Sequence, residues 1–460
     1  MRRSRALANT VTNSTFDYDL LVIGAGSAGL SAATTAAQHG AQVAIADPDL
    51  IGGTCINRGC VPKKFMVFAA DFARQQCLAK SYGWVNPSGQ FDWLMLRTAI
   101  DRELAKLRQS YQSKLTKLGV TVLNDAARFV DPHKVELGDR TVVVDKVIIA
   151  TGAQPVKPDL PGIDCGLTSR DMFQLEALPS QLTIVGGGYI GAEFSNIFAT
   201  LGCNVTLIDK NDWILPGFDE DIRKALHHSL MDQGIRLCAE TSLKALRTDE
   251  SGIHVSLSGK HDDTLLADTL LLALGRKPNL ESLNLEAAGV EVKDGAIAVD
   301  DYSRTSQPSI FAIGDCTDRL PLTPVAKAEG AAAAKTLFTD RPQAVSYRWV
   351  PSAVFCSPEA ATVGWSEAEA RSHDDLEIEV RCSRFTPLRY LPSSQQREAL
   401  IKLVVNAKSQ EILGLHLVGD EASEMIQGFI PALRRGLTVA ELTETIGLHP
   451  TSGEEIFALD

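Results

Sequence analysis

Residues 18–30, YDLLVIGAGSAGL, read as a short apolar strand that runs directly into the glycine pattern G-x-G-x-x-G. A helical stretch follows to His39, and a second apolar strand at residues 42–46 ends on Asp47. The order of strand, glycine turn, helix, strand and acid is typical of a dinucleotide-binding βαβ unit. The sequence therefore predicts an α/β fold that begins with a nucleotide site.

The three glycines of this pattern have separate tasks in such a site. Gly24 would make the tight turn, Gly26 would let the backbone approach a pyrophosphate, and Gly29 would let the helix pack on the strand. Asp47 is placed to accept hydrogen bonds from a ribose diol. The glycine pattern alone is weak evidence, but the flanking strand, helix and acid make it strong.

The same unit occurs a second time in the chain. Residues 186–191, GGGYIG, follow a short strand and open a helix, and the next strand ends on Asp209. The interval from the first glycine to the acid is 23 residues in both units. Two dinucleotide units in one enzyme usually mean that a nicotinamide coenzyme passes electrons to a flavin, so the sequence predicts redox chemistry.

Residues 52–64, GGTCINRGCVPKK, place Cys55 and Cys60 between glycines, directly before a proline and two lysines. Proline suits the first turn of a helix, and a thiol at a helix N-terminus beside cations ionises readily, so Cys60 is expected to be a thiolate at neutral pH. A second thiol within reach makes the pair a candidate redox disulfide. Two ordinary buried cysteines are the alternative for this spacing alone. No Cys-x2-Cys pair occurs elsewhere, so no metal site is expected.

Composition narrows the class of protein. The chain has 460 residues, 45% hydrophobic and 22% charged, which fits several globular domains. A net charge of −12 disfavours nucleic acid or an anionic membrane as the main partner. Nine scattered cysteines favour the cytoplasm, and the apolar run at residues 20–37 is too polar to span a membrane. The basic residues 1–16 are expected to be a disordered extension, with a transit peptide as the alternative.

The remaining chain reads as further α/β scaffold and then changes character. Helices are predicted at 62–80, 93–118 and 322–338, with strands near 120 and 142 and at 146–152, 268–275 and 309–315. From residue 348 alternating segments near 353 and 378 and at 400–405 and 414–418 predict an antiparallel sheet with helices at 421–435 and 439–445.

With six of its sequence motifs taken together, the chain resembles the pyridine nucleotide–disulfide oxidoreductases, and among them most closely the glutathione reductases. The six motifs are GGTCINRGCVPKK, GGGYIGAE, ALGRKPN, AIGDC, LTPVA and the terminal HPTSGEE. The resemblance covers nearly the whole chain and implies two Rossmann-like domains, for FAD and NAD(P), and a C-terminal α+β dimerisation domain. The implied boundaries are 17–152 and 279–347 for FAD, 153–278 for NAD(P) and 348–460 for dimerisation.

The resemblance also implies a role for each site residue. Cys60 would lie against the flavin, and Cys55 would attack the substrate disulfide. His449 of the partner subunit, oriented by Glu454, would be the acid/base, which implies a homodimer. Lys63 would lie near the flavin and pair with Glu193, and Tyr189 would gate the nicotinamide pocket. The implied FAD residues are Gly24, Gly26, Ser27, Gly29, Asp47, Thr54, Cys55, Lys63, Ala127, Gly152, Asp315 and Thr323; the NAD(P) residues are Gly186, Gly188, Tyr189, Ile190, Gly191, Glu193, Asp209, Lys210, Gly275 and Arg276; the substrate residues are Ser27 and Tyr111.

The implied reaction is reduction of glutathione disulfide by NAD(P)H through FAD and the Cys55–Cys60 pair. Gly191 and Asp209 favour NADH, because a carboxylate would repel the 2′-phosphate of NADPH. Thr34 and Ala331 stand where arginines bind the glutathione carboxylates in animal-type enzymes. Dihydrolipoamide dehydrogenase, which usually has Pro-Ser-Lys after the second cysteine, and reductases of other small disulfides are therefore alternatives. A flavoprotein that binds nucleotides and partner proteins without turning over a disulfide is the alternative from another class.

Overall fold

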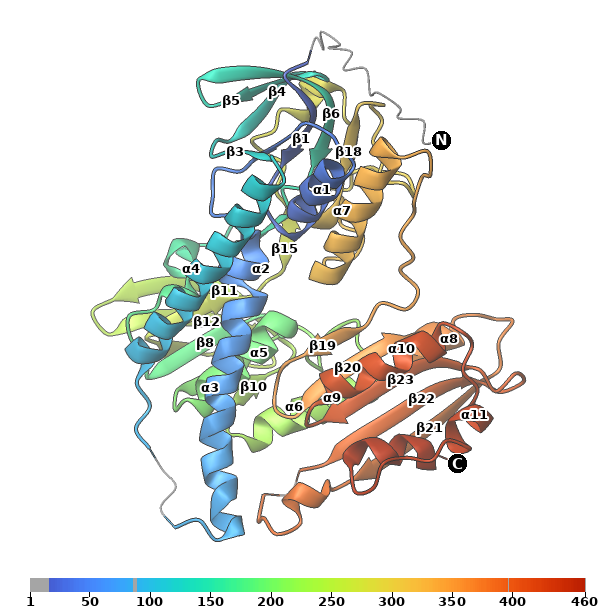
Figure 1. Cartoon of the computed structure of the whole chain (residues 1–460). Coiled ribbons are helices and arrows are strands. Elements are labelled where there is room, and N and C mark those ends of the chain that lie inside the picture. The colour runs from blue at the N-terminus through green and yellow to red at the C-terminus, as the bar shows by residue number, and fades with distance from the viewer. Residues whose placement is uncertain (1–15, 86–88, 396, 460) are drawn as a thin grey trace. The chain divides into compact units, whose positions relative to one another are not determined.

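The computed structural model describes residues 16–85, 89–395 and 397–459, and these divide into two compact units (Figure 1). The extension predicted for residues 1–16 lies outside the described residues, apart from Phe16. Among the helices of the described chain, none has both the length and the apolar character that a bilayer crossing requires. The first unit comprises Met1–Cys55, Leu107–Gln154 and Lys277–Val345, and the second comprises Ile56–Lys106, Pro155–Arg276 and Ser346–Asp460.

The first unit is built on a parallel sheet. Its strand order is β3-β2-β1-β6, and β18 pairs with the far side of β6. Strands β2 and β18 and the ends of β1 and β6 are continuously apolar and buried, as expected for parallel strands that are covered on both faces. Their bounds are β1 (Tyr18–Ile23), β2 (Val43–Ala46), β3 (Thr121–Leu123), β6 (Arg140–Ile149) and β18 (Ile310–Ala312).

Two helices of the first unit, α1 (Ser27–Gln38) and α7 (Thr323–Phe338), lie against each other (Figure 1). Their shared face is rich in alanine, and Gly330 of α7 approaches α1 so closely that a Cβ there would lie 2.3 Å from the carbonyl oxygen of Ala28. Small side chains therefore allow the close packing that holds both helix N-termini in place.

Several strands of the first unit differ from the prediction made from the sequence. The two strands expected near 142 and at 146–152 form the single strand β6, whose first half pairs with β5 and whose second half pairs with β1. Asp145 and Lys146 interrupt the apolar run where the two halves meet, so the sequence reads as two strands. Two antiparallel strands, β4 (Ala127–Asp131) and β5 (Lys134–Leu137), and a short hairpin of β16 (Val292–Lys293) and β17 (Ala296–Ile297) were not predicted.

The second unit contains a second parallel sheet, of order β10-β9-β8-β14. Helix α5 (Tyr189–Thr200) follows its central strand and contacts α3 (Cys60–Ala79). The strands are β8 (Gln181–Val185), β9 (Asn204–Ile208), β10 (Arg236–Cys238) and β14 (Thr269–Leu272). Helix α6 (Glu220–Asp232) and the antiparallel strands β11 (Thr241–Asp249), β12 (Gly252–Gly259) and β13 (Thr264–Ala267) were not predicted.

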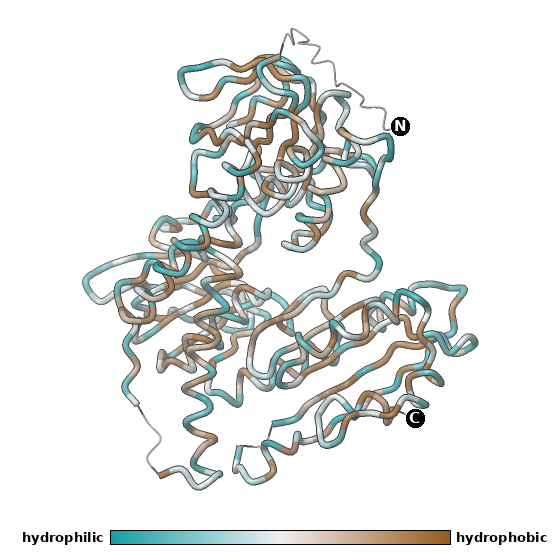
Figure 2. Tube along the Cα trace, in the orientation of Figure 1, coloured by the Kyte–Doolittle hydropathy of each residue, from teal (hydrophilic) through white to brown (hydrophobic). Residues whose placement is uncertain are grey.

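The predicted C-terminal antiparallel sheet is confirmed, with strand order β19-β20-β23-β22-β21. Its strands appear as brown bands in Figure 2, and one face packs on helices while the other meets α8 (Glu367–Arg371). The helix predicted at 421–435 is broken, because Pro431 cannot continue a helix that starts before it. The elements are β19 (Ser352–Val354), β20 (Glu359–Gly364), β21 (Ile378–Phe385), β22 (Ala399–Asn406), β23 (Ile412–Gly419), α9 (Ala422–Met425), α10 (Ile430–Leu433) and α11 (Val439–Thr443).

Candidate active site

The first glycine turn has a shape that only glycine allows. Gly24 has a φ of +108°, and a Cβ on it would lie 2.3 Å from the carbonyl oxygen of Ala150. A Cβ on Gly29 would lie 1.8 Å from the carbonyl oxygen of Gly24. Both positions bring backbone against backbone, so the turn and the packing of α1 on β1 depend on the missing side chains.

The N-terminus of α1 is suited to a pyrophosphate. Gly26 is its N-cap, and no side chain of the described residues caps the helix, so its first N–H groups can meet an anion. Gly53 comes so close that a Cβ on it would lie 2.6 Å from the Cα of Gly26, which brings the start of α2 (Gly53–Arg58) to this turn. Ser27 and Thr54, both predicted FAD residues, are the first residue of α1 and the second of α2.

Asp47, which was predicted to accept hydrogen bonds from a ribose diol, also orders the loop around it. Its Oδ2 accepts a hydrogen bond of 2.6 Å from the Ala25 N–H, and its Oδ1 accepts one of 2.9 Å from the Asp49 N–H. The carboxylate therefore faces the glycine turn, where a ribose diol is expected.

Other residues of the first unit also fit a bound dinucleotide. Asp315 lies in a 3-10 turn, Gly314–Thr317, whose Gly314 N–H donates to buried Glu329 at 2.6 Å. Glu329 also pairs with Arg319 at 3.1 Å. The sequence analysis did not single out Glu329. It is the one acid of the alanine-rich helix α7, and this was the signal that could have identified it. The hydroxyl of Thr151, next to Gly152, is buried without a hydrogen-bond partner in the described chain, as expected for an atom that would contact a bound polar ligand.

The second glycine turn repeats the first. Gly186 has a φ of +109°, and a Cβ on it would lie 2.3 Å from the carbonyl oxygen of Ala273. A Cβ on Gly191 would lie 1.9 Å from the Gly186 oxygen. Gly188 is the N-cap of α5, and a Cβ on it would meet no atom of the described residues within 4 Å. The space in front of α5 can therefore receive a second pyrophosphate.

Asp209 occupies the place that Asp47 has in the first unit. One oxygen accepts the Gly187 N–H, and the other accepts the backbone and side-chain N–H groups of Asn211 at 2.8 and 2.7 Å. The loop that follows is held by Arg223, whose side chain donates to the carbonyl oxygens of Trp213 and Ile214 at 2.8 and 2.9 Å. Sequence reasoning missed Arg223, because only the fold brings α6 to this loop.

The two motif cysteines lie on consecutive helices. Cys55 is in α2, which was not predicted, and Cys60 is the first residue of α3, where a thiol was expected. Cys55 is partly buried and Cys60 is exposed. By contrast, burial raises the pKa of Cys203 to about 11 and of Cys316 to about 12, so these two thiols stay protonated and unreactive.

The predicted pair of Lys63 and Glu193 is present in the second unit. Lys63 Nζ lies 2.8 Å from Glu193 Oε1, and both side chains are largely buried. The same oxygen accepts the Phe355 N–H at 2.9 Å. Tyr189, the predicted gate, is an exposed side chain at the start of the same helix α5. The ion pair is confirmed, while the roles of these residues stay predictions.

The predicted pair of His449 and Glu454 is also present. His449 Nδ1 lies 3.0 Å from both oxygens of Glu454, and Glu454 also accepts the Thr451 N–H at 3.1 Å. The carboxylate therefore orients the ring and leaves Nε2 for a reacting proton. The imidazole is 80% exposed, so this chain's own described residues do not cover it.

The structure assigns the other predicted residues to one unit or the other. Tyr111 packs against the core beneath α1, and Thr34 donates its hydroxyl to the Leu30 carbonyl oxygen at 2.7 Å within α1. Gly275 has a φ of +100°, as a turn after β14 requires. The first unit also holds Ala127, Thr323 and Ala331, and the second holds Ile190, Lys210 and Arg276.

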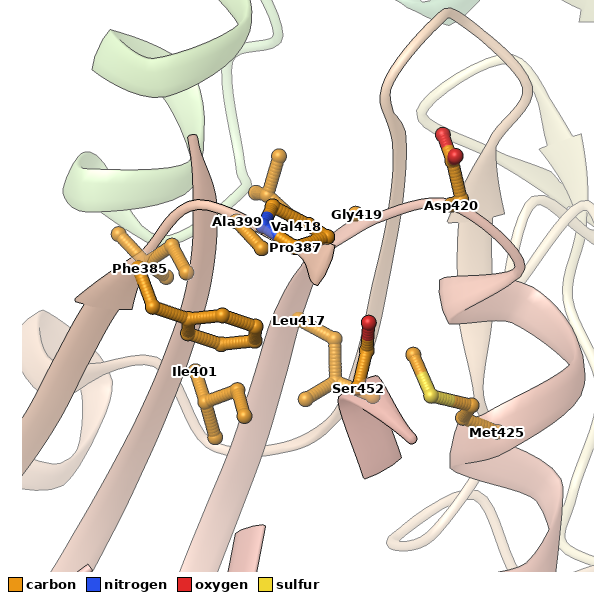
Figure 3. A pocket seen from close by; sticks show the side chains of 11 residues that line it. Phe385, Pro387, Ala399, Ile401, Leu417, Val418, Gly419, Asp420, Met425 and Ser452 are labelled. Atoms are coloured by element: carbon orange, nitrogen blue, oxygen red, sulfur yellow. The ribbon is translucent and has the colours of Figure 1, made fainter. Parts of the chain in front are cut away.

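A small cavity in the C-terminal sheet is not the active site. It lies between Phe385, Leu417, Met425 and Ser452 and has an apolar lining (Figure 3). Its volume of about 10 Å³ holds at most one water molecule. No substrate of the predicted size fits there.

Known proteins match this chain over almost its whole length. The family described as pyridine nucleotide-disulphide oxidoreductase matches residues 18–330, and its dimerisation domain matches residues 350–458. A glutathione reductase of Nostoc sp. is 44% identical over 97% of this chain and 100% of the relative. One of Burkholderia cepacia is 40% identical over 96% of this chain and 98% of the relative.

Solved structures agree with these relatives. The HOCl-induced flavoprotein disulfide reductase RclA from Escherichia coli has a TM-score of 0.85 and 30% identity, over 96% of this chain and 99% of that chain. The glycine turns, the cysteine motif and the pairs of Lys63 with Glu193 and His449 with Glu454 lie within the matched ranges. The chain belongs to the pyridine nucleotide–disulphide oxidoreductase family and is an FAD-dependent disulfide oxidoreductase that uses NAD(P)H.

Proposed function

We propose that this enzyme reduces glutathione disulfide, with NADH as its preferred electron donor. The observation that carries the proposal is the near full-length similarity to glutathione reductases, and this chain's own cysteine motif lies within the range that the family matches. Bound at the first glycine turn and the N-terminus of α1, FAD would supply the two-electron chemistry that links the nicotinamide coenzyme to the Cys55–Cys60 disulfide. The proposed domains are 17–152 with 279–347 for FAD, 153–278 for the coenzyme and 348–460 for dimerisation.

The chain's own residues supply the steps around this transfer. The glycine turns and the N-termini of α1 and α5 bind the two pyrophosphates, and the α3 N-terminus stabilises the Cys60 thiolate. The Cys55 thiolate attacks one sulfur of the substrate, and His449 protonates the thiolate that leaves. Cys60 then attacks the Cys55 sulfur, which restores the disulfide and releases the second thiol.

Exposed apolar side chains support a homodimer in this proposal. Ile446 and Leu448, directly before His449, are 97% and 75% exposed. Adjacent exposed apolar residues are typical of a protein interface, and they lie in the range matched by the dimerisation domain. We propose that His449 of the partner subunit serves each active site. A cytoplasmic location stays a prediction.

Two positions favour a second candidate, a reductase of another small disulfide. Thr34 uses its hydroxyl within α1, and Ala331 has no polar group, so neither can bind a glutathione carboxylate as an arginine does. The substrate's carboxylates must then be recognised elsewhere or be absent.

Steady-state kinetics with glutathione disulfide, lipoamide and modified glutathione disulfides, each with NADH and NADPH, tests the proposal. Glutathione disulfide with NADH should give the highest kcat/KM, and Cys55→Ser should abolish it. A kcat/KM for another disulfide that exceeds the glutathione value by about tenfold, or about 1.4 kcal/mol of transition-state stabilisation, would overturn the substrate assignment.

A further inference from the structure

One aromatic ring of the second unit contacts both lysines of the redox motif. The Nζ atoms of Lys63 and Lys64 each lie 4.0 Å from the centroid of the Phe355 ring. Each lysine also pairs with a carboxylate, Lys63 with Glu193 at 2.8 Å and Lys64 with Glu359 at 3.0 Å. Phe355 follows β19 and lies in the range matched by the dimerisation domain, nearly 300 residues after the lysines.

The ring restrains the Lys63 ammonium. Lysine carries its charge on a flexible four-carbon stem, and a single carboxylate leaves that stem several rotamers. The negative face of an aromatic ring attracts an ammonium, most strongly where water is excluded. Because Lys63 is largely buried, the ring favours the rotamer in which the ammonium lies between Phe355 and Glu193.

Phe355 also fixes the carboxylate of this pair. Its N–H donates to Glu193 Oε1 at 2.9 Å, the oxygen that Lys63 binds. Glu359, the partner of Lys64, is in turn fixed by the Ser423 hydroxyl at 2.7 Å. The backbone and the ring of Phe355 thus have separate tasks: the backbone holds the carboxylate, and the ring holds the cation.

We propose that Phe355 is a positioning residue for Lys63 and that its ring sets how fast the bound flavin is reduced. The inference rests on the proposed function and on the position near the flavin that the family resemblance implies for Lys63. It assigns a contribution to catalysis to the dimerisation domain of the same chain, separate from that of His449. If the ring were only a packing element, any apolar side chain of similar volume would replace it.

Phe355→Leu tests this, because it removes the ring and keeps the N–H on Glu193. Mixed with NADH in a stopped-flow instrument, the variant should reduce its flavin about fivefold more slowly, the loss expected for one cation–π contact of about 1 kcal/mol. The two-electron-reduced enzyme should have a long-wavelength absorbance band that arises from charge transfer between the Cys60 thiolate and the flavin. This band should also weaken, since Lys63 follows Cys60 within the first turn of α3. The apparent Kd for NADH should not change.

Three variants keep the test decisive. Phe355→Tyr retains a ring and should reduce its flavin within about twofold of the wild-type rate. Phe355→Met replaces Phe355→Leu if that variant does not fold. Phe429→Leu, which removes a ring that packs on Phe457 in the same domain, should leave the rate and the absorbance unchanged.

Two outcomes would overturn the inference: a Phe355→Leu or Phe355→Met rate within about twofold of wild type in protein that retains FAD, or a Phe355→Tyr rate as low as that of Phe355→Leu. Failure of the proposed function gives a different result. In that case the wild-type protein itself reduces another disulfide faster than glutathione disulfide, or reduces no disulfide, whatever the flavin-reduction rates of the Phe355 variants.

Discussion

The two nucleotide turns of this chain are the same structure made from different sequences. The Gly24 N–H donates to Ala46 at 2.7 Å and the Gly186 N–H donates to Ile208 at 2.8 Å. In both turns the acid at the end of the next strand accepts the N–H of the residue after the first glycine. Equal spacing in the sequence has therefore produced equal hydrogen bonding.

The turns differ in the chain that follows them. The Ala25 oxygen accepts the Gly52 N–H at 2.9 Å, and the chain then enters the cysteine motif. The Gly187 oxygen accepts the Leu215 N–H at 2.7 Å, and the chain then reaches Asp219, the N-cap of α6. The two turns therefore differ in function through the segments that follow them. The segment after the first turn carries the redox cysteines, and the segment after the second turn holds helix α6 in place.

Changing the segment after the first turn has the largest expected effect. Cys60→Ser should lower disulfide reduction by at least about a thousandfold, because the relay loses one of its two sulfurs. The long-wavelength absorbance of the reduced enzyme should disappear as well. Cys77→Ser, on the exposed side of the same helix, is the matched control. A band that persists in Cys60→Ser would remove Cys60 from its role.

A substitution in each glycine turn should impair the binding of one cofactor and leave the other bound. Gly24→Ala forces a methyl group into the Ala150 carbonyl and should yield protein without flavin, measured by its visible absorbance. Gly186→Ala should retain flavin but lose about a hundredfold in kcat/KM for the coenzyme.

Gly188→Ala is the sharper control for the second turn, since its methyl group meets no atom of the described chain within 4 Å. The variant should unfold at the wild-type temperature and still have a raised KM for NADH. A normal KM would mean that the coenzyme does not lie over α5.

Asp209 should determine whether the enzyme prefers NADH or NADPH. Asp209→Ala combined with Asn211→Arg should shift the ratio of kcat/KM for NADPH over NADH by about 10- to 100-fold, since it removes a hydroxyl acceptor and adds a phosphate partner. Asp209→Ala alone should weaken both coenzymes, because Asp209 also holds Gly187. If the double variant keeps the wild-type ratio, Asp209 does not select the coenzyme.

The anchor after the second turn should affect stability more than activity. Lys402 is fully buried and lies 2.8 Å from Asp219, 2.6 Å from Asp221 and 2.9 Å from Glu367. Lys402→Met leaves the buried Asp219 carboxylate without its cation and should cost about 3–5 kcal/mol in urea unfolding. A loss below about 1 kcal/mol would mean that the cluster does not hold α6.

The same cluster predicts a dependence on pH. Burial acts to raise the pKa of Asp219, but the hydrogen bonds from Lys402 and the Glu367 N–H outweigh it, so the pKa is lowered. A hydrogen bond from Lys402 lowers the pKa of Glu367 as well. The stability that these lowered pKa values contribute is complete above the unfolded-state pKa values of about 4, and it is lost as pH falls through the lower folded-state pKa values. The free energy of unfolding, measured in urea at pH 3 to 6, should show this loss in the wild type and not in Lys402→Met.

The sequence predicted the features that depend on neighbours along the chain. Both glycine turns, their acids and the cysteine at the head of α3 were recognisable because each signal lies within about 25 residues. Features that depend on distant contacts were missed: Glu329 under the Gly314 turn, Lys402 at α6, and Phe355 on the redox lysines. Each joins a polar or aromatic side chain to a partner that only the fold brings near.

Anaerobic titration of the purified enzyme with NADH tests the central claim, that electrons pass from the second nucleotide site through FAD to Cys55 and Cys60. One equivalent should produce the long-wavelength band and two new titratable thiols while most flavin absorbance remains, and glutathione disulfide should reverse both changes. Full loss of flavin absorbance after one equivalent, with no new thiols, would contradict the account.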